Sequence, residues 1–185
     1  MFGLRQAGKI AYAMISLGLL VLRLVVGGIL FAHGAQKLFG WWGGPGMQGW
    51  TGAITRMRLR PAAPWAWISA LAELTGGIGF ALGLLDPLPS FAIAGSMLVA
   101  IALVHLPKGF FNTKGGFEFN LSLLAGVAAI ALAGPGAYSL DAVLGIRFPE
   151  PVTLIVMTVL TILGVGTALL TRTPAPATET KTQTA

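Results

Sequence analysis

Four side chains of types used in acid–base chemistry stand near the ends of apolar segments. They are His33, Lys37, His105 and Glu118. Residues four apart share one face of a helix, so His33 and Lys37 lie side by side if the first helix continues that far. Imidazole, ammonium and carboxyl groups donate, accept and transfer protons. We therefore predict that these four residues line one polar pocket and have catalytic roles in it.

Other chemistry is open to the two histidines. Histidines from facing helices are able to ligate haem, and His33, His105 and Glu118 together match a two-histidine, one-carboxylate metal set. The spacing is diagnostic of neither, and both histidines stand beside lysines, Lys37 and Lys108. Hydrogen bonding, proton transfer and simple hydration by water remain as alternatives. We expect no metal or haem.

Two charges lie inside apolar segments, Arg23 in the first and Glu73 in the second. An unpaired charge in hydrocarbon is costly, so such residues usually face the protein interior and pair with an opposite charge. Counted at about 1.5 Å per residue from the same side, the two residues reach comparable depths. We predict a structural ion pair between Arg23 and Glu73.

The composition is that of an integral membrane protein. Of the 185 residues, 55% are hydrophobic and only 10% are charged, far fewer charges than a soluble surface needs. In a membrane protein the net charge of +6 reports orientation, so it implies no nucleic-acid partner. The chain has no cysteine, which excludes disulfides and thiolate chemistry on its own residues.

The apolar runs predict an all-α helical membrane bundle of five spans. They cover residues 11–33, 65–85, 88–106, 118–133 and 152–170. We expect a four-helix core over residues 1–145, an additional transmembrane helix over 146–171 and a disordered tail over 172–185. Small residues within the spans, such as Gly27 and Gly28, are expected to let helices pack closely.

The long connection over residues 34–64 is rich in glycine and tryptophan. It is expected to be an interfacial or partly re-entrant segment, or else an ordinary surface loop with an aromatic belt. More basic residues lie in this connection, in the one near residue 110 and in the tail than in the opposite loops. The positive-inside rule therefore predicts that these three segments, and so the C-terminus, are cytoplasmic.

Several blocks of residues, in this order, resemble the DoxX/DoxD-like membrane proteins. They are Arg23; His33-Gly34-x-Gln36-Lys37-Leu38-Phe39-Gly40 with Gly43-Gly44; Ala72-Glu73 with Gly76-Gly77; His105 before Gly109-Phe110-Phe111; Gly115-Gly116-x-Glu118; and Gly134-Pro135-Gly136 running into Ser139-Leu140-Asp141. The resemblance covers approximately residues 15–145 and omits the fifth run and the tail. It implies a four-helix bundle in a bacterial inner (plasma) membrane.

The resemblance also implies a redox role. Founding members of the family are associated with thiosulfate:quinone oxidoreduction, and others with thiol or oxidative stress. We therefore expect a quinone-interacting subunit of an oxidoreductase system, with a redox partner protein, a quinone as cofactor, and Trp41 and Trp42 covering the quinone ring. Without cysteine, sulfur chemistry would need that partner. A non-catalytic anchor that docks a soluble redox enzyme on Arg56, Arg58 and Arg60 is the alternative, followed by a small-solute transporter; a homo-oligomer is compatible with each.

Overall fold

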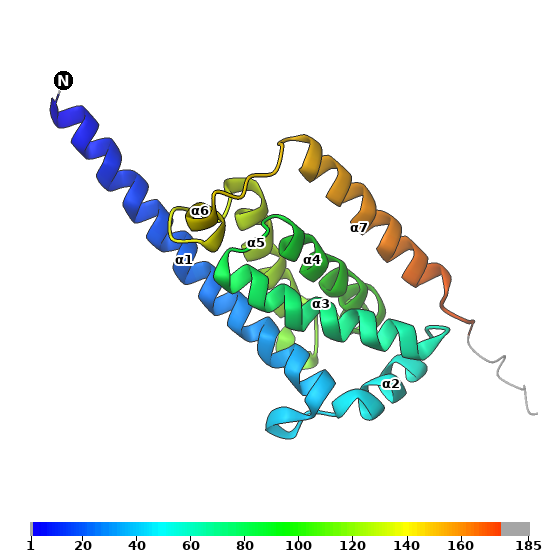
Figure 1. Cartoon of the computed structure of the whole chain (residues 1–185). Helices are drawn as coiled ribbons and strands as arrows, with labels where there is room; N and C mark the ends of the chain where they lie inside the picture. The colour runs from blue at the N-terminus through cyan, green and yellow to red at the C-terminus, as the bar shows by residue number, and fades with distance from the viewer. Residues whose placement is uncertain (1, 175–185) are drawn as a thin grey trace, which may run out of the picture.

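The computed structural model describes residues 2–174 as an all-helical bundle (Figure 1). Its helices are α1 (Phe2–Phe39), α2 (Gly46–Arg56), α3 (Ala62–Leu82), α4 (Leu88–Ala100), α5 (Glu118–Ala133), α6 (Leu140–Leu144) and α7 (Val152–Leu170). A π-helical turn, Ile101–His105, extends α4, and 3-10 turns occupy Trp41–Gly43, Leu106–Lys108 and Asn112–Lys114. The predicted all-α membrane bundle is confirmed.

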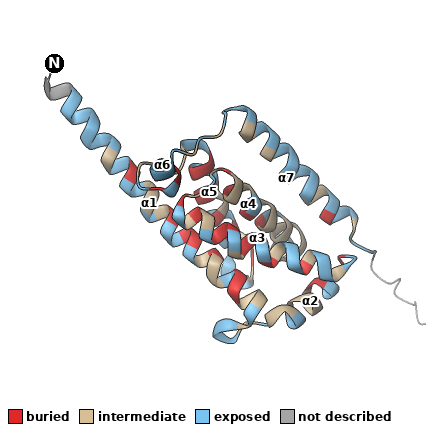
Figure 2. Ribbon diagram, in the orientation of Figure 1, coloured by how far each residue is buried: buried red, intermediate tan, exposed pale blue. Residues whose placement is uncertain are grey.

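Four of the helices are long and apolar enough to cross a membrane. They cover Arg5–Phe39, Ala62–Leu82, Leu88–Lys108 and Val152–Leu170. The remaining predicted span, α5, has 16 residues and is therefore about 24 Å long, somewhat less than the hydrocarbon core of about 30 Å. The amino-terminal part of α1 projects beyond the other helices (Figure 1), and its side chains from Arg5 to Tyr12 are exposed (Figure 2).

The predicted boundaries need two corrections. The first helix does not end near His33 but continues to Phe39. The segment between them has no proline, and its one glycine, Gly34, stays within the helix. The long connection is not mainly loop, since α2 occupies Gly46–Arg56 and packs under α1 and α3.

The helices α1 and α3 run antiparallel with their backbones in contact. A Cβ atom on Gly34 would lie 2.4 Å from the backbone nitrogen of Leu74, and one on Gly77 would lie 2.5 Å from that of Phe31. Such distances leave room only for glycine, as in other close helix crossings within membranes. The small residues therefore fix the register of α1 on α3. The predicted packing role is confirmed for Gly27, where a Cβ atom would lie 2.6 Å from the carbonyl oxygen of Gly77, but at Gly28 a Cβ atom would meet nothing within 4 Å.

A buried apolar core joins α1, α3, α4 and α5. It consists of Val26, Leu30, Phe80, Ile93, Met97, Leu123, Val127 and Ile130. A smaller cluster of Ile54, Leu59 and Ala66 ties α2 to the start of α3. Residues on the outside of the bundle are exposed, as the pale blue ribbon of Figure 2 shows. Many of them are large and apolar, which suits contact with lipid.

Helix α7 lies against α4 at the side of the four-helix core. Its end is also attached to the α2–α3 connection, because the amide of Arg60 donates to the carbonyl of Thr171 at 3.1 Å and the amide of Thr173 to that of Arg58 at 3.0 Å. Leu59 and Arg172 form the isolated antiparallel bridge between these segments. The first residues of the predicted disordered tail are thus paired, and residues 175–185 of that tail lie outside the described part.

Candidate functional site

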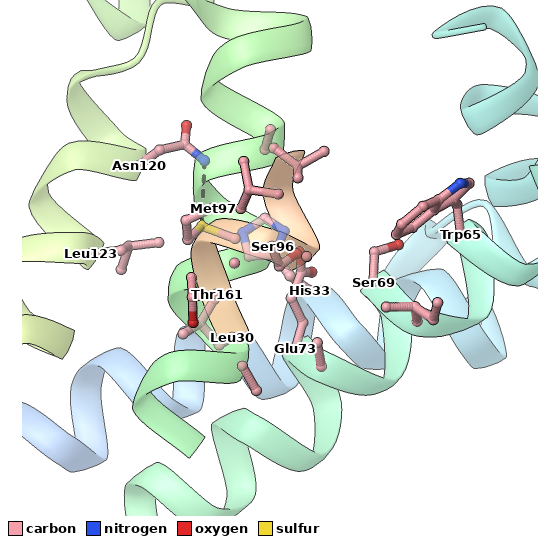
Figure 3. Close-up of a pocket in the computed structure, with 18 of the residues that line it drawn as sticks. Leu30, His33, Trp65, Ser69, Glu73, Ser96, Met97, Asn120, Leu123 and Thr161 are labelled. Carbon is pink, nitrogen blue, oxygen red and sulfur yellow. Dashed lines mark hydrogen bonds between the residues drawn. The ribbon is translucent and has the colours of Figure 1, made fainter. Parts of the chain in front are cut away.

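A cavity of about 710 Å³ lies among α1, α2, α3, α4, α5 and α7. Its lining is mostly apolar, and the polar side chains are concentrated where α1, α3 and α4 meet. Figure 3 shows Glu73 of α3, Ser96 of α4 and His33 of α1 together, with Asn120 and Leu123 of α5 on one side and Ser69 and Trp65 of α3 on the other. This size is typical of cavities that hold small organic ligands.

An ion pair between Lys37 and Glu73 borders the cavity. The Lys37 ammonium donates to Oε2 of Glu73, and the Ser96 hydroxyl donates to Oε1 at 2.8 Å. The two side chains are 15% and 2% exposed, respectively. Because both carboxylate oxygens accept a hydrogen bond, the buried charge of Glu73 is compensated on each side.

Trp50 of α2 holds the lysine from its other side. The Lys37 Nζ lies 4.3 Å from the centroid of the Trp50 ring, a cation–π geometry. The indole Nε1 of Trp50 donates to the Ser69 hydroxyl at 2.9 Å. Ser69 stands one helical turn before Glu73, so α3 positions both the carboxylate and the residue that orients Trp50.

His33 and Asn120 lie on the α5 side of the cavity. The ring centroids of His33 and Phe119 are 6.2 Å apart. The side-chain amide of Asn120 donates to the sulfur of Met97 at 3.4 Å. Both His33 and Asn120 line the cavity, so an imidazole and an amide are available to a ligand there.

The other predicted site residues have different surroundings. His105 lines the cavity, and its Nδ1 lies 2.7 Å from the carbonyl oxygen of Gly115, which requires that this nitrogen carry the proton. Glu118 begins α5 and is not part of the cavity lining. Trp41 and Trp42 stack edge to face on each other, are exposed, and lie outside this cavity. The structure thus brings His33, Lys37 and His105 to one cavity, without Glu118.

The predicted ion pair between Arg23 and Glu73 is wrong. The depths were counted from the end of the first span, near His33 to Lys37, and from Trp65, as if these two points were level. The structure instead places Lys37 beside Glu73, about three helical turns after the start of α3 at Ala62. In the observed antiparallel register Glu73 lies opposite Lys37, and Arg23 lies opposite Gly83, after the end of α3.

Arg23 instead joins a second polar cluster at the opposite end of the bundle. Its Nη2 donates to the Tyr138 carbonyl, and its Nε and Nη1 atoms are buried without a hydrogen-bond partner among residues 2–174. The carboxylate of Asp141 accepts the amides of Leu85 and Asp86 at 2.8 and 2.9 Å. This cluster fastens the α3–α4 turn to the loop that carries α6.

Asp86 in that turn is an unusual carboxyl group. Burial is the main reason that its pKa is raised to about 6, and the neighbouring Asp141 also raises it. The Ser90 hydroxyl, which donates to Asp86 Oδ1 at 3.2 Å, acts in the other direction. Asp86 therefore changes charge in a pH range where most aspartates are fully ionised.

No group of three or more histidine, aspartate or glutamate side chains gathers to hold a metal within residues 2–174. The alternative set of His33, His105 and Glu118 is accordingly not assembled.

Sequence reasoning missed Trp50, Ser69, Ser96 and Asn120 as site residues. Polar side chains within apolar helices are the pattern that singles out the last three, although Ser69 and Ser96 were taken for small packing residues. Trp50 does not stand out in the sequence because α2 was not predicted, and nothing in the pattern indicates that its ring faces Lys37.

A helical membrane protein with a buried ion pair beside an apolar cavity is the class that this fold and site define. Residues 18–106, just under half of the chain, match the sequence model of the DoxX family. This match covers α1 from residue 18 through His105 and therefore includes the ion pair, but it ends well before residue 145, where the expected resemblance ended.

A protein of Mycobacterium tuberculosis named as an uncharacterized membrane protein is 29% identical over 130 residues, covering 65% of this chain and 77% of the relative. No solved structure matches the chain significantly. The comparisons thus agree with the helical membrane architecture of the structure.

Proposed function

We propose that this protein is a quinone-interacting membrane subunit of a redox system and that the cavity beside Lys37 and Glu73 holds the quinone ring. One observation carries the proposal: charged and hydroxyl groups border an apolar cavity among membrane helices. A quinone is apolar except at its two carbonyl oxygens, and it reaches such a site from the lipid. A ligand of this kind needs an apolar cavity with few, well-placed donors.

The residues divide into donors and ring contacts. Lys37 lines the cavity and has two ammonium hydrogens besides the one that it donates to Glu73, so a quinone carbonyl that approaches it accepts a hydrogen bond. Ser96 donates its single hydroxyl hydrogen to Glu73 and so positions the carboxylate that holds Lys37. Trp50 and Phe119 offer aromatic surface to the ring. His33, whose side chain lines the same space, is the proton donor of choice because an imidazole ring both donates and accepts protons.

Reduction of a quinone to a quinol consumes electrons as well as protons. The proposal assigns the electrons to a partner redox protein and the proton delivery to this chain. It also places the protein in a bacterial inner membrane, with its C-terminus and the basic connections in the cytoplasm, in agreement with the positive-inside rule.

The test measures how tightly a quinone with a short tail binds to the purified protein in detergent. Binding is followed by the quenching of tryptophan fluorescence. We expect saturable binding that Ser96→Ala weakens severalfold, because Glu73, the partner of Lys37, loses the hydrogen bond that holds its carboxylate in place. Ser122→Ala is the matched control, since this exposed hydroxyl on α5 donates only to its own helix, at the Glu118 carbonyl. Absence of saturable binding, or equal binding by both variants, would refute the proposal.

A second candidate function is membrane anchoring of a soluble redox enzyme. It is supported by the backbone bonds that hold residues 58–60 against residues 171–173, which gather Arg58, Arg60 and Arg172 at one end of the bundle. We expect substitution of these arginines by glutamine to release an acidic partner that co-purifies with the protein. Removal of the same number of charges at Arg5, Lys9 and Arg147 is the control, and equal retention by both variants would exclude this candidate.

A further inference from the structure

The cavity extends well beyond the polar residues that a quinone ring would contact. Along α4 and its continuation, its lining runs from Leu88 to His105, a distance of about 25 Å at the rise of a helix. This approaches the thickness of the hydrocarbon core of a bilayer, about 30 Å. The space thus extends along most of α4, with many of its polar groups where α1, α3 and α4 meet.

Helix α7 supplies the outer wall of this space. Met157, Leu160, Thr161, Gly164 and Val165 line the cavity opposite the exposed faces of α3 and α4. α7 packs mainly on α4, and a Cβ atom on Gly95 of α4 would lie only 3.9 Å from Thr161 Cγ2. Of these five residues of α7, only Thr161 has a hydroxyl group that is able to form a hydrogen bond with a ligand.

We propose that this part of the cavity binds the isoprenoid tail of a membrane quinone, with the tail lying between α4 and α7 and the ring beside Lys37, Glu73 and Ser96. This inference rests on the proposed function and names the substrate class: quinones with long isoprenoid tails. Three observations support it: the space is continuous with the polar residues, it is apolar, and it runs along the membrane-spanning direction of α4.

The tail site gives α7, the fifth predicted span, a role in ligand binding. The family match ends at residue 106, before α7 begins, so the residues that border the ring lie mainly in the matched part and the tail wall lies outside it. A tail held along about 25 Å of helix contributes binding energy in proportion to the apolar area that it buries. A quinone without a tail forgoes that contribution.

Two glycines on α7 allow a controlled test. Gly164 lines the cavity, whereas Gly166 does not, and a Cβ atom on either one would meet nothing within 4 Å. Leucine also has the higher helix propensity, so Gly164→Leu and Gly166→Leu are both expected to fold. The first variant fills part of the tail space, and the second adds the same side chain outside it.

The experiment measures the affinity of the purified protein for a long-tailed menaquinone and for a quinone of the same ring without a tail. We expect Gly164→Leu to weaken binding of the long-tailed quinone about tenfold and to leave binding of the tail-less quinone unchanged. Gly166→Leu is expected to change neither affinity.

Each other outcome has a definite meaning. If Gly164→Leu leaves the long-tailed affinity unchanged, or lowers both affinities equally, the tail site is refuted, while saturable binding of the tail-less quinone keeps the proposed function intact. If a phospholipid displaces the long-tailed quinone and binds with the same dependence on Gly164, the groove is a lipid site and the inference is wrong. If the wild-type protein binds neither quinone, both the tail site and the proposed function are refuted.

Discussion

Replacing Lys37 by methionine would leave the carboxylate of Glu73 buried without its countercharge. Breaking a buried ion pair from one side typically costs about 3–5 kcal/mol, because the remaining charge is uncompensated. The Glu73 side chain is 2% exposed, but that of Lys37 is 15% exposed, so some water reaches the pair. The hydrogen bond from Ser96 also survives. We therefore expect a loss of about 3 kcal/mol, at the lower end of the range.

The loss is measurable as a change in thermal unfolding of the detergent-solubilised protein. For a chain of this size, about 3 kcal/mol corresponds to a decrease in Tm of roughly 6–12 °C. Lys9→Met, on the exposed amino-terminal part of α1, is the matched control and should stay within about 0.5 kcal/mol of the wild type.

The double variant Lys37→Met with Glu73→Gln separates a lost charge pair from a lost side chain. With no charge left in the site, it should be more stable than Lys37→Met alone, although one more native group has been removed. If the destabilisation of the double variant equals the sum of those of Lys37→Met and Glu73→Gln, the two side chains are not coupled and the description of the site is wrong. The same follows if Lys37→Met is as stable as Lys9→Met.

Two further predictions concern the cluster at the opposite end. Gly83 and Gly145 both have left-handed backbone conformations, with φ of +61° and +68°. A Cβ at Gly83 would lie 1.5 Å from Arg23 Nη1, whereas one at Gly145 would meet nothing within 4 Å. Gly145→Ala should therefore cost about 1–2 kcal/mol from backbone strain alone and Gly83→Ala clearly more, and equal thermal shifts would contradict the close packing of Arg23. The pKa of Asp86 is raised by burial from 3.8 to about 6, so the folded state binds more protons than the unfolded state and stability falls as pH rises from about 4 to 6, by about 1–2 kcal/mol after allowance for partial solvation. Asp86→Asn should lack this component, and a difference in stability between wild type and variant that does not vary with pH would refute the assignment.

The helical architecture was predictable from the chain because hydrocarbon imposes it. Long apolar runs have no stable alternative to helices in a bilayer, and the predicted starts of α4, α5 and α7 match the structure. Helix α2 was not predictable in the same way. It lies in a glycine-rich segment with moderate apolar content, and its position depends on tertiary contacts of Ile54 with Leu59 and Ala66.

The site was predictable in its residue types but not in its partners. His33, Lys37 and His105 were expected to share a pocket, and they line one cavity. Pairing of charges depends on the register between two helices, and an error of one turn moves a side chain by about 5.4 Å. Treating the end of α1 as level with the start of α3 was enough to assign Arg23 to Glu73, although Lys37 lies beside Glu73 and Arg23 beside Gly83.

The contact between α1 and α3 explains why both polar clusters exist together. Gly34 and Gly77 allow these backbones to touch at one register; that register sets Lys37 against Glu73 and, at the other end, Arg23 against Gly83. Sliding α1 by one turn would separate Lys37 from Glu73 and Arg23 from its turn at once, leaving several buried groups unpaired. The glycines and the buried charges therefore specify the same arrangement by different means, steric fit and electrostatics, and the cavity beside Glu73 keeps its shape only while both hold.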